Sequence, residues 1–182
     1  MKIFSVVCCV WALLLTLAVR ADEAILIGGE IRFHGRVVAL PCSIAPGDET
    51  LQVDFKQLST EDLYLNRQSR PVGFTLHLIN CSTTVYKTVT VTFSGERSQA
   101  LPESLRVHSN ASGGTAGIAI DLRQDNGNPL TLDQPTPATD LTRGSMQLGF
   151  QALVRGEPDA LQQHNLQLGP FTSTASYTLN YQ

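Results

Sequence analysis

Apolar and polar residues alternate with a period of two in several short stretches of the chain. Outside the first 21 residues, these stretches cover residues 30–35, 74–78, 89–93, 118–122, 146–154 and 171–181. A period of two places every second side chain on the same face of a strand, which is typical of a strand with one buried face. No stretch of similar length has a convincing 3.6-residue stripe. The pattern therefore predicts an all-β chain.

Clusters of turn-forming residues separate the predicted strands. They lie at residues 45–48, 109–114, 125–129, 134–137 and 156–159. Gly, Pro, Asn, Asp and Ser in such clusters favour turns, because they adopt or stabilise the backbone angles that turns need. Short alternating strands joined in this way indicate a β-sandwich of immunoglobulin-like kind. The tryptophan that marks an antibody domain is missing, since Trp11 is the only tryptophan and precedes all the strands.

The first 21 residues follow a different pattern. Lys2 precedes an apolar run from Ile3 to Leu17, and Val19 and Ala21 stand three residues and one residue before a possible cleavage site. This arrangement predicts a secretory signal peptide over residues 1–21. A membrane anchor is the alternative, but the run is shorter than the roughly 20 residues that a spanning helix needs. The remaining chain would be exported.

Composition and charge narrow the choice of partner. The 182 residues are 42% hydrophobic and 16% charged, with a formal net charge of −3. No run of Lys or Arg is present, whereas nucleic acids and anionic membranes are bound through clustered positive charge. We therefore expect no nucleic-acid partner.

Two cysteines remain after the predicted signal peptide, which contains Cys8 and Cys9. In an oxidising compartment, Cys42 and Cys81 predict one disulfide. A metal pair or a redox dithiol is the alternative, but the sequence has no Cys-x-x-Cys and no histidine beside either cysteine. The structural disulfide is the favoured interpretation.

Motifs for catalysis or for metal binding are missing from the sequence. The four histidines lie at least 31 residues apart, and no Gly-x-Ser-x-Gly elbow or Walker loop is present. The adjacent acids Asp48-Glu49 and Glu61-Asp62 are typical of solvated loops. We therefore predict a protein that is not an enzyme and that has no cofactor or metal, although a site assembled from distant residues remains an alternative.

Both ends of the chain carry more specific patterns. The N-terminal part reads AILIGGEIRFHGRVV over residues 24–38 and leads to Pro41-Cys42, while FTLHLINC ends at Cys81. Gly169 stands 14 residues from the C-terminus, counting the last residue as the first, and Tyr181 is penultimate. Taken together, these features resemble the chaperone–usher pilins, the type 1 fimbrial subunit family. The resemblance covers essentially the whole chain after residue 21.

The resemblance implies an incomplete immunoglobulin-like β-sandwich that is completed by a donor strand from another chain. Residues 22–33 would be the N-terminal donor-strand extension and residues 34–182 the pilin domain. Gly29 would allow close backbone approach, and the side chains that point into a neighbour's groove would be Ile25, Ile27, Ile31 and Phe33. Strand donation between chaperone and pilin is an established case of β-strand addition. The alternative is that this segment forms the first strand of its own sandwich.

The C-terminal segment resembles the strand by which a pilus chaperone recognises its subunit. The residues concerned are Gly169, Phe171, Ala175, Tyr177, Leu179 and Tyr181. The alternative is an ordinary edge strand of the core, and both roles are compatible. The implied partners are a periplasmic pilus chaperone, an outer-membrane usher, and other copies of this chain or related pilins.

The sequence thus predicts a structural subunit of a type 1-like fimbria on the surface of a Gram-negative bacterium. It would be exported through the periplasm, polymerise by donor-strand exchange and support cell adhesion. A two-domain adhesin is not expected, because only a few residues precede the first motif. The alternative function is a self-contained secreted β-sandwich that acts as a binding module.

Overall fold

The computed structural model describes residues 29–35, 40–109 and 115–182. The chain divides into two units, residues 1–38 and residues 39–182. The predicted signal peptide and the predicted donor residues Ile25 and Ile27 lie outside the described residues.

In the first unit, the described residues 29–35 form no regular secondary structure. The prediction of a strand here is wrong for the single chain. A strand is held by backbone bonds to a neighbour, and these residues make none with the described part of the chain. Ile31 and Phe33 are 77% and 89% exposed.

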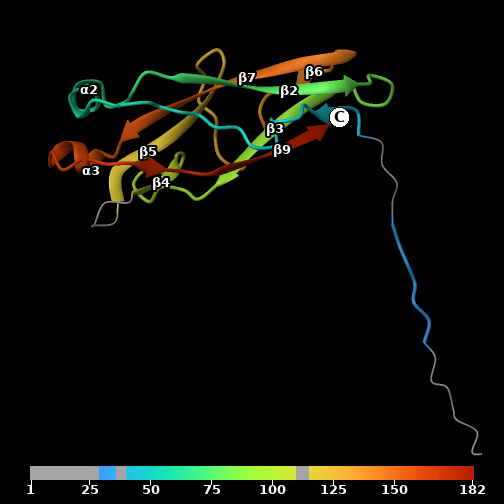
Figure 1. The fold of residues 1–182 in the computed structure, drawn as a ribbon, viewed down its shortest axis with the longest axis horizontal. Helices are drawn as coiled ribbons and strands as arrows, with labels where there is room; N and C mark the ends of the chain where they lie inside the picture. The colour runs from blue at the N-terminus through green and yellow to red at the C-terminus, as the bar shows by residue number, and fades with distance from the viewer. Residues whose placement is uncertain (1–28, 36–39, 110–114) are drawn as a thin grey trace, which may run out of the picture. The chain divides into compact units, whose positions relative to one another are not determined.

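The second unit consists of two antiparallel sheets (Figure 1). The six-stranded sheet has the order β1 (Ser43–Ile44), β2 (Val72–Cys81), β7 (Gly144–Gly156), β5 (Thr115–Gln124), β4 (Leu105–Ser109) and β8 (Phe171–Thr172). The three-stranded sheet has the order β6 (Thr139–Asp140), β3 (Thr88–Gly95) and β9 (Ala175–Tyr181). The predicted all-β sandwich is confirmed.

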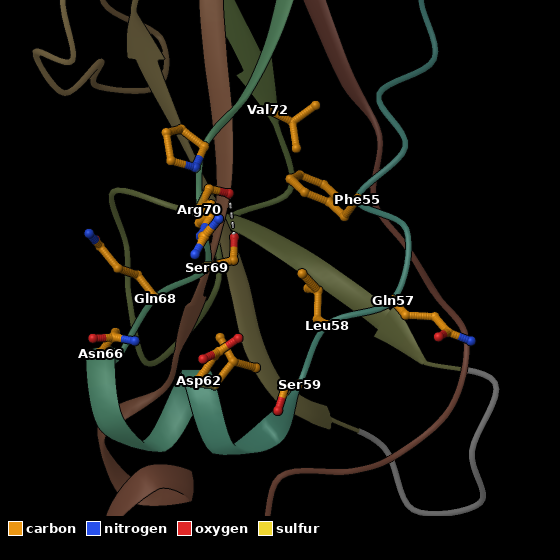
Figure 2. A pocket seen from close by; sticks show the side chains of 12 residues that line it. Phe55, Gln57, Leu58, Ser59, Asp62, Asn66, Gln68, Ser69, Arg70 and Val72 are labelled. Carbon is orange, nitrogen blue, oxygen red and sulfur yellow. Dashed lines mark hydrogen bonds between the residues drawn. The ribbon is translucent and has the colours of Figure 1, made fainter.

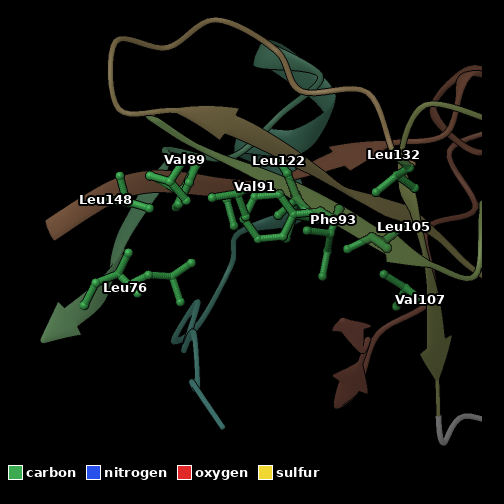
Figure 3. Packing of buried hydrophobic residues seen from close by; sticks show 14 of the residues in the cluster. Leu76, Val89, Val91, Phe93, Leu105, Val107, Leu122, Leu132 and Leu148 are labelled. Atoms are coloured by element: carbon green, nitrogen blue, oxygen red, sulfur yellow. The ribbon is translucent and has the colours of Figure 1, made fainter. Parts of the chain in front are cut away.

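The alternating residues of both sheets form one hydrophobic core. Val89, Val91 and Phe93 of β3 are buried against residues of β2 and β7, and Figure 3 shows several of these side chains packed together. The ring of Phe93 meets the ring of Phe150 edge to face at 4.9 Å between centroids, a favoured aromatic geometry. The period-two pattern therefore located the buried faces correctly.

Two short helices were not predicted. They are α2 (Thr60–Asn66) and α3 (Pro158–Gln162), and each buries one residue, Leu63 or Ala160. Helices of two turns or fewer are too short to show a hydrophobic stripe in the sequence. The residues predicted as a turn at 156–159 instead lead into α3, whose Pro158 suits the first helical turn. Within the described residues, no helix has the length and apolar character needed to cross a membrane.

The predicted disulfide between Cys42 and Cys81 is present. It joins the residue before β1 to the last residue of β2, and both cysteines are buried. The backbone N–H of Ser82 also donates to the carbonyl of Pro41 at 2.6 Å. The start of the second unit is thereby fixed to the end of β2.

The C-terminal segment forms two strands where the sequence predicted one continuous strand. β8 pairs with β4 in the six-stranded sheet, whereas β9 pairs with β3 in the three-stranded sheet. Ser173 and Thr174 lie between them, and the hydroxyl of Ser173 donates to the carbonyl of Arg106 at 2.6 Å. The chain changes sheets here, which interrupts the ladder, and Ala175, the first residue of β9, is exposed although the alternation predicted it to be buried.

Candidate functional site

Among the described residues, one edge of β9 has no strand beside it. On its other edge, β9 pairs with β3 in continuous register from Val89 opposite Tyr181 to Gly95 opposite Ala175. No second strand among the described residues pairs with β9. An edge of this kind presents a row of free N–H and C=O groups that can pair with another chain.

A second stretch of backbone also lacks partners. Residues 51–58, here called the unpaired segment, connect the turn after β1 to α2. Their half-buried and exposed side chains alternate as in a strand: Leu51, Val53 and Phe55 pack against the core, while Gln52 and Asp54 are exposed. Their backbone makes no backbone–backbone hydrogen bond with the described residues. The segment has the side-chain pattern of a strand without its ladder.

Side chains of the C-terminal segment contact the turn before the unpaired segment at one point and the unpaired segment itself at another. The Tyr177 hydroxyl donates to the carbonyl oxygen of Asp48 at 2.8 Å. The rings of Phe55 and Phe171 lie 6.1 Å apart between centroids. The order of these contacts means that the two segments run in opposite directions. Their backbones are not bonded to one another, so both keep unused hydrogen-bonding groups.

Three predicted recognition residues, Tyr177, Leu179 and Tyr181, share one face of β9. They are half-buried and pack against the core. Burial raises the pKa of both tyrosines, and the nearby carboxylates of Asp48 and Glu49 raise that of Tyr177 further. Both phenols therefore stay protonated at neutral pH and can donate hydrogen bonds.

The other three predicted recognition residues have different surroundings. Phe171 is half-buried beside Phe55, whereas Ala175 is exposed. Gly169 is exposed and has φ +134°, a backbone angle that residues with a Cβ rarely adopt, so the turn into β8 requires glycine. The structure thus brings together only part of the predicted set.

The last residue of the chain is fixed to the start of β3. The Gln182 carbonyl oxygen accepts hydrogen bonds from the backbone N–H groups of Lys87 and Thr88 at 2.7 and 2.9 Å. The Gln182 N–H donates to the carbonyl of Thr88 at 3.0 Å. The hydrogen bonds between this end of the chain and β3 therefore continue to the last residue.

Sequence reasoning missed the part played by Asp48. The sequence predicted a solvated loop acid, but the Asp48 side chain is only 14% exposed and its Oδ2 lies 2.9 Å from His77 Nδ1. The backbone N–H of His77 also donates to this carboxylate, and this bond is the main reason that the pKa of Asp48 is lowered. The two residues are 29 positions apart, so no local pattern in the sequence could show the contact.

A cavity of about 590 Å³ lies between the unpaired segment, α2 and the start of β2 (Figure 2). Phe55, Leu58 and Val72 contribute its apolar wall, and polar side chains such as Asp62 and Arg70 surround the rest. The Ser69 hydroxyl accepts a hydrogen bond from Val154 N–H at 3.0 Å and donates to the Arg70 carbonyl at 2.9 Å. It is thus a structural group on the cavity wall.

Across the described ranges, no three His, Cys, Asp or Glu side chains converge on a point that could hold a metal ion. The backbone groups of β9 that have no partner among the described residues can pair with another strand.

Comparison with known sequences gives a consistent result. Residues 31–182 match the family model described as "Fimbrial protein". The chain is 39% identical over 157 residues to the putative minor fimbrial subunit PmfF of Proteus mirabilis, covering 86% of each chain. It is also 32% identical over 175 residues to the fimbrial adapter PapK of Escherichia coli, covering 93% of this chain and 96% of PapK.

Comparison with solved structures supports the same relationship. The crystal structure of the P pilus rod subunit PapA matches with a TM-score of 0.67 and 26% sequence identity, covering 79% of this chain and 100% of PapA. A structure of a chaperone–usher pilus that concerns rod uncoiling matches with a TM-score of 0.67 and 25% identity.

Proposed function

The chain belongs to the fimbrial protein family, and from this premise we propose how it works as a structural subunit of a chaperone–usher fimbria on the surface of a Gram-negative bacterium. A strand from a second chain inserts beside β9 and completes the sandwich. The subunit in turn lends its own N-terminal segment to a neighbour. The resulting fibre supports cell adhesion.

The observation that carries this proposal is that β9, at one edge, and the unpaired segment have backbone N–H and C=O groups without a partner among the described residues. A strand beside β9 would satisfy its free N–H and C=O groups. Its inward side chains would meet the half-buried Tyr177, Leu179 and Tyr181 on one side and Leu51 and Val53 on the other. Backbone bonds would then provide affinity, and the apolar side chains would provide specificity.

The proposed donor is the segment of residues 22–33. Its described part exposes Ile31 and Phe33, and an extended strand would place these two apolar side chains on the same face. The donor and the acceptor are different surfaces of one molecule, so the contact is heterologous and does not close on itself. Repetition of this contact produces a filament.

The free edge also explains the proposed partners during export. We infer that residues 1–21 are removed as a signal peptide and that a periplasmic chaperone first occupies the edge of β9. An outer-membrane usher would then exchange the chaperone for the next subunit. Such protection is needed because an open edge beside apolar side chains promotes aggregation.

Purification from the periplasm tests the proposal. The full chain, produced with the chaperone and usher of its own fimbria, should be recovered bound to the chaperone or as SDS-resistant multimers. A variant that lacks residues 22–33 should remain bound to the chaperone but add no neighbour through its own donor segment. A full chain that is recovered as a stable monomer, without any partner, would support a self-contained binding module and refute the proposal.

A further inference from the structure

Asp48 makes two kinds of hydrogen bond with two different sheets. It lies in the turn between β1 and the unpaired segment. Its carboxylate oxygen Oδ2 accepts from the backbone N–H of His77 in β2 at 2.5 Å. The same oxygen faces His77 Nδ1 at 2.9 Å, and because a carboxylate only accepts, Nδ1 carries the hydrogen.

The carboxylate replaces a backbone acceptor where the β1–β2 ladder ends. Ala45 N–H donates to the His77 carbonyl at 2.9 Å, which extends the pairing one residue beyond β1. The chain then turns away, and Asp48 N–H donates to the Ala45 carbonyl at 3.0 Å. The Asp48 side chain reaches back to the N–H of His77. This turn is therefore held against the six-stranded sheet.

The backbone carbonyl of Asp48 is bonded to the other sheet. It accepts the hydroxyl of Tyr177, which belongs to β9, at 2.8 Å. The carboxylate bond to His77 is one of the bonds that hold this turn, together with the backbone bond from Asp48 N–H to Ala45. One residue thus connects β2 with β9 beside the free edge, where no backbone ladder joins the two.

We propose that Asp48 is a positioning residue for strand insertion, because it fixes the separation of the two sheets beside the free edge of β9 through the Tyr177 hydroxyl. This inference rests on the proposed function and adds to it the residue that prepares the acceptor. An incoming strand then meets edges already held at the right spacing. Preorganisation of this kind lowers the cost of ordering on binding.

The test measures how well the acceptor keeps a donor strand. The full chain in complex with its chaperone is incubated with a fluorescent synthetic peptide of residues 22–33, and peptide release is followed after dilution. Tyr177→Phe removes only the bridging hydroxyl, and we expect release to become about fivefold faster, as for the loss of one ordinary hydrogen bond. Tyr86→Phe is the matched control, because the Tyr86 hydroxyl has no hydrogen-bond partner among the described residues.

Two further variants separate positioning from general stability. Asp48→Ala should accelerate peptide release by a similar factor. Adding Tyr177→Phe to Asp48→Ala should change the release rate little further, because the Tyr177 hydroxyl has already lost its fixed partner. Asp48→Asn keeps an acceptor oxygen for the His77 N–H and should restore release to within about twofold of the wild type.

The outcomes distinguish this inference from the proposed function. Failure of the wild-type complex to take up the peptide would overturn the proposed function and this inference with it. Normal uptake, with equal release from Tyr177→Phe and Tyr86→Phe, would overturn the inference alone. Additive effects of Asp48→Ala and Tyr177→Phe, or no restoration by Asp48→Asn, would also overturn it.

Discussion

Replacing Phe33 with alanine should weaken assembly without weakening the subunit itself. The Phe33 side chain is 89% exposed, so Phe33→Ala should leave the free energy of unfolding of a single subunit unchanged. In the proposed fibre the ring becomes buried in a neighbour. Complete burial of such a side chain contributes about 1.5–3 kcal/mol. Since 1.4 kcal/mol is a factor of ten, the variant should lose its neighbour roughly 10- to 100-fold faster.

The assay compares three full-length chains: the wild type, Phe33→Ala and His34→Ala. His34 is the matched control, because neighbouring residues of a strand point to opposite faces and His34 would point away from the acceptor. The loss of SDS-resistant multimers with temperature reports assembly, and urea unfolding of the peptide-filled, chaperone-free subunit reports its stability. Equal multimer loss for Phe33→Ala and His34→Ala would refute the assignment of Phe33. A lower unfolding free energy for Phe33→Ala would show that the ring already packs within its own subunit.

Three other predictions concern the domain itself. The Cys42→Ala/Cys81→Ala double variant should lose about 4 kcal/mol of stability in urea unfolding, because the bridge closes a loop with a sequence separation of 39; a loss below about 1 kcal/mol would contradict this entropic account. Folding lowers the pKa of Asp48, so the ionised carboxylate stabilises the folded state. This stabilisation is complete above about pH 3.9, the pKa of an unfolded aspartate, and it is lost as the pH falls through the lower pKa of the folded state. Urea unfolding between about pH 4 and pH 2 should therefore show a decline that Asp48→Asn makes shallower, and an identical slope in the variant would exclude this contribution. Removal of Tyr181 and Gln182 deletes the backbone bonds to the start of β3, so periplasmic levels measured by immunoblot should fall, and unchanged levels would contradict the assigned role of the chain end.

The sequence predicted those elements whose pattern is long enough to repeat. β2, β3, β5, β7 and β9 were all expected from their alternation, and each spans at least seven residues. β4 has only five residues, and it was missed although Leu105 and Val107 are buried in alternation. The two helices were missed for the same reason, since one buried residue in each defines no period.

Elements that depend on distant partners could not be predicted from local pattern. Residues 30–35 have the alternation of a strand, but they pair with no strand among the described residues. The change of sheet at Ser173 depends on which strands lie beside β8 and β9. The contacts of Asp48 join residues of three separate segments. In each case the deciding neighbour is remote in the sequence.

The disulfide has a mechanical consequence for a fibre under tension. In the proposed assembly, a pull on the N-terminal segment enters the domain through the backbone near Cys42, and β1 alone has only two paired residues to hold it. The covalent bond to Cys81 passes the load directly to β2, which is paired with β7 over most of its length. At the other end of the load path, a donor lying along β9 would be pulled in shear, so that its backbone bonds resist together instead of opening one after another. The disulfide between Cys42 and Cys81 thus lies at the point where tension would otherwise separate β1 from β2.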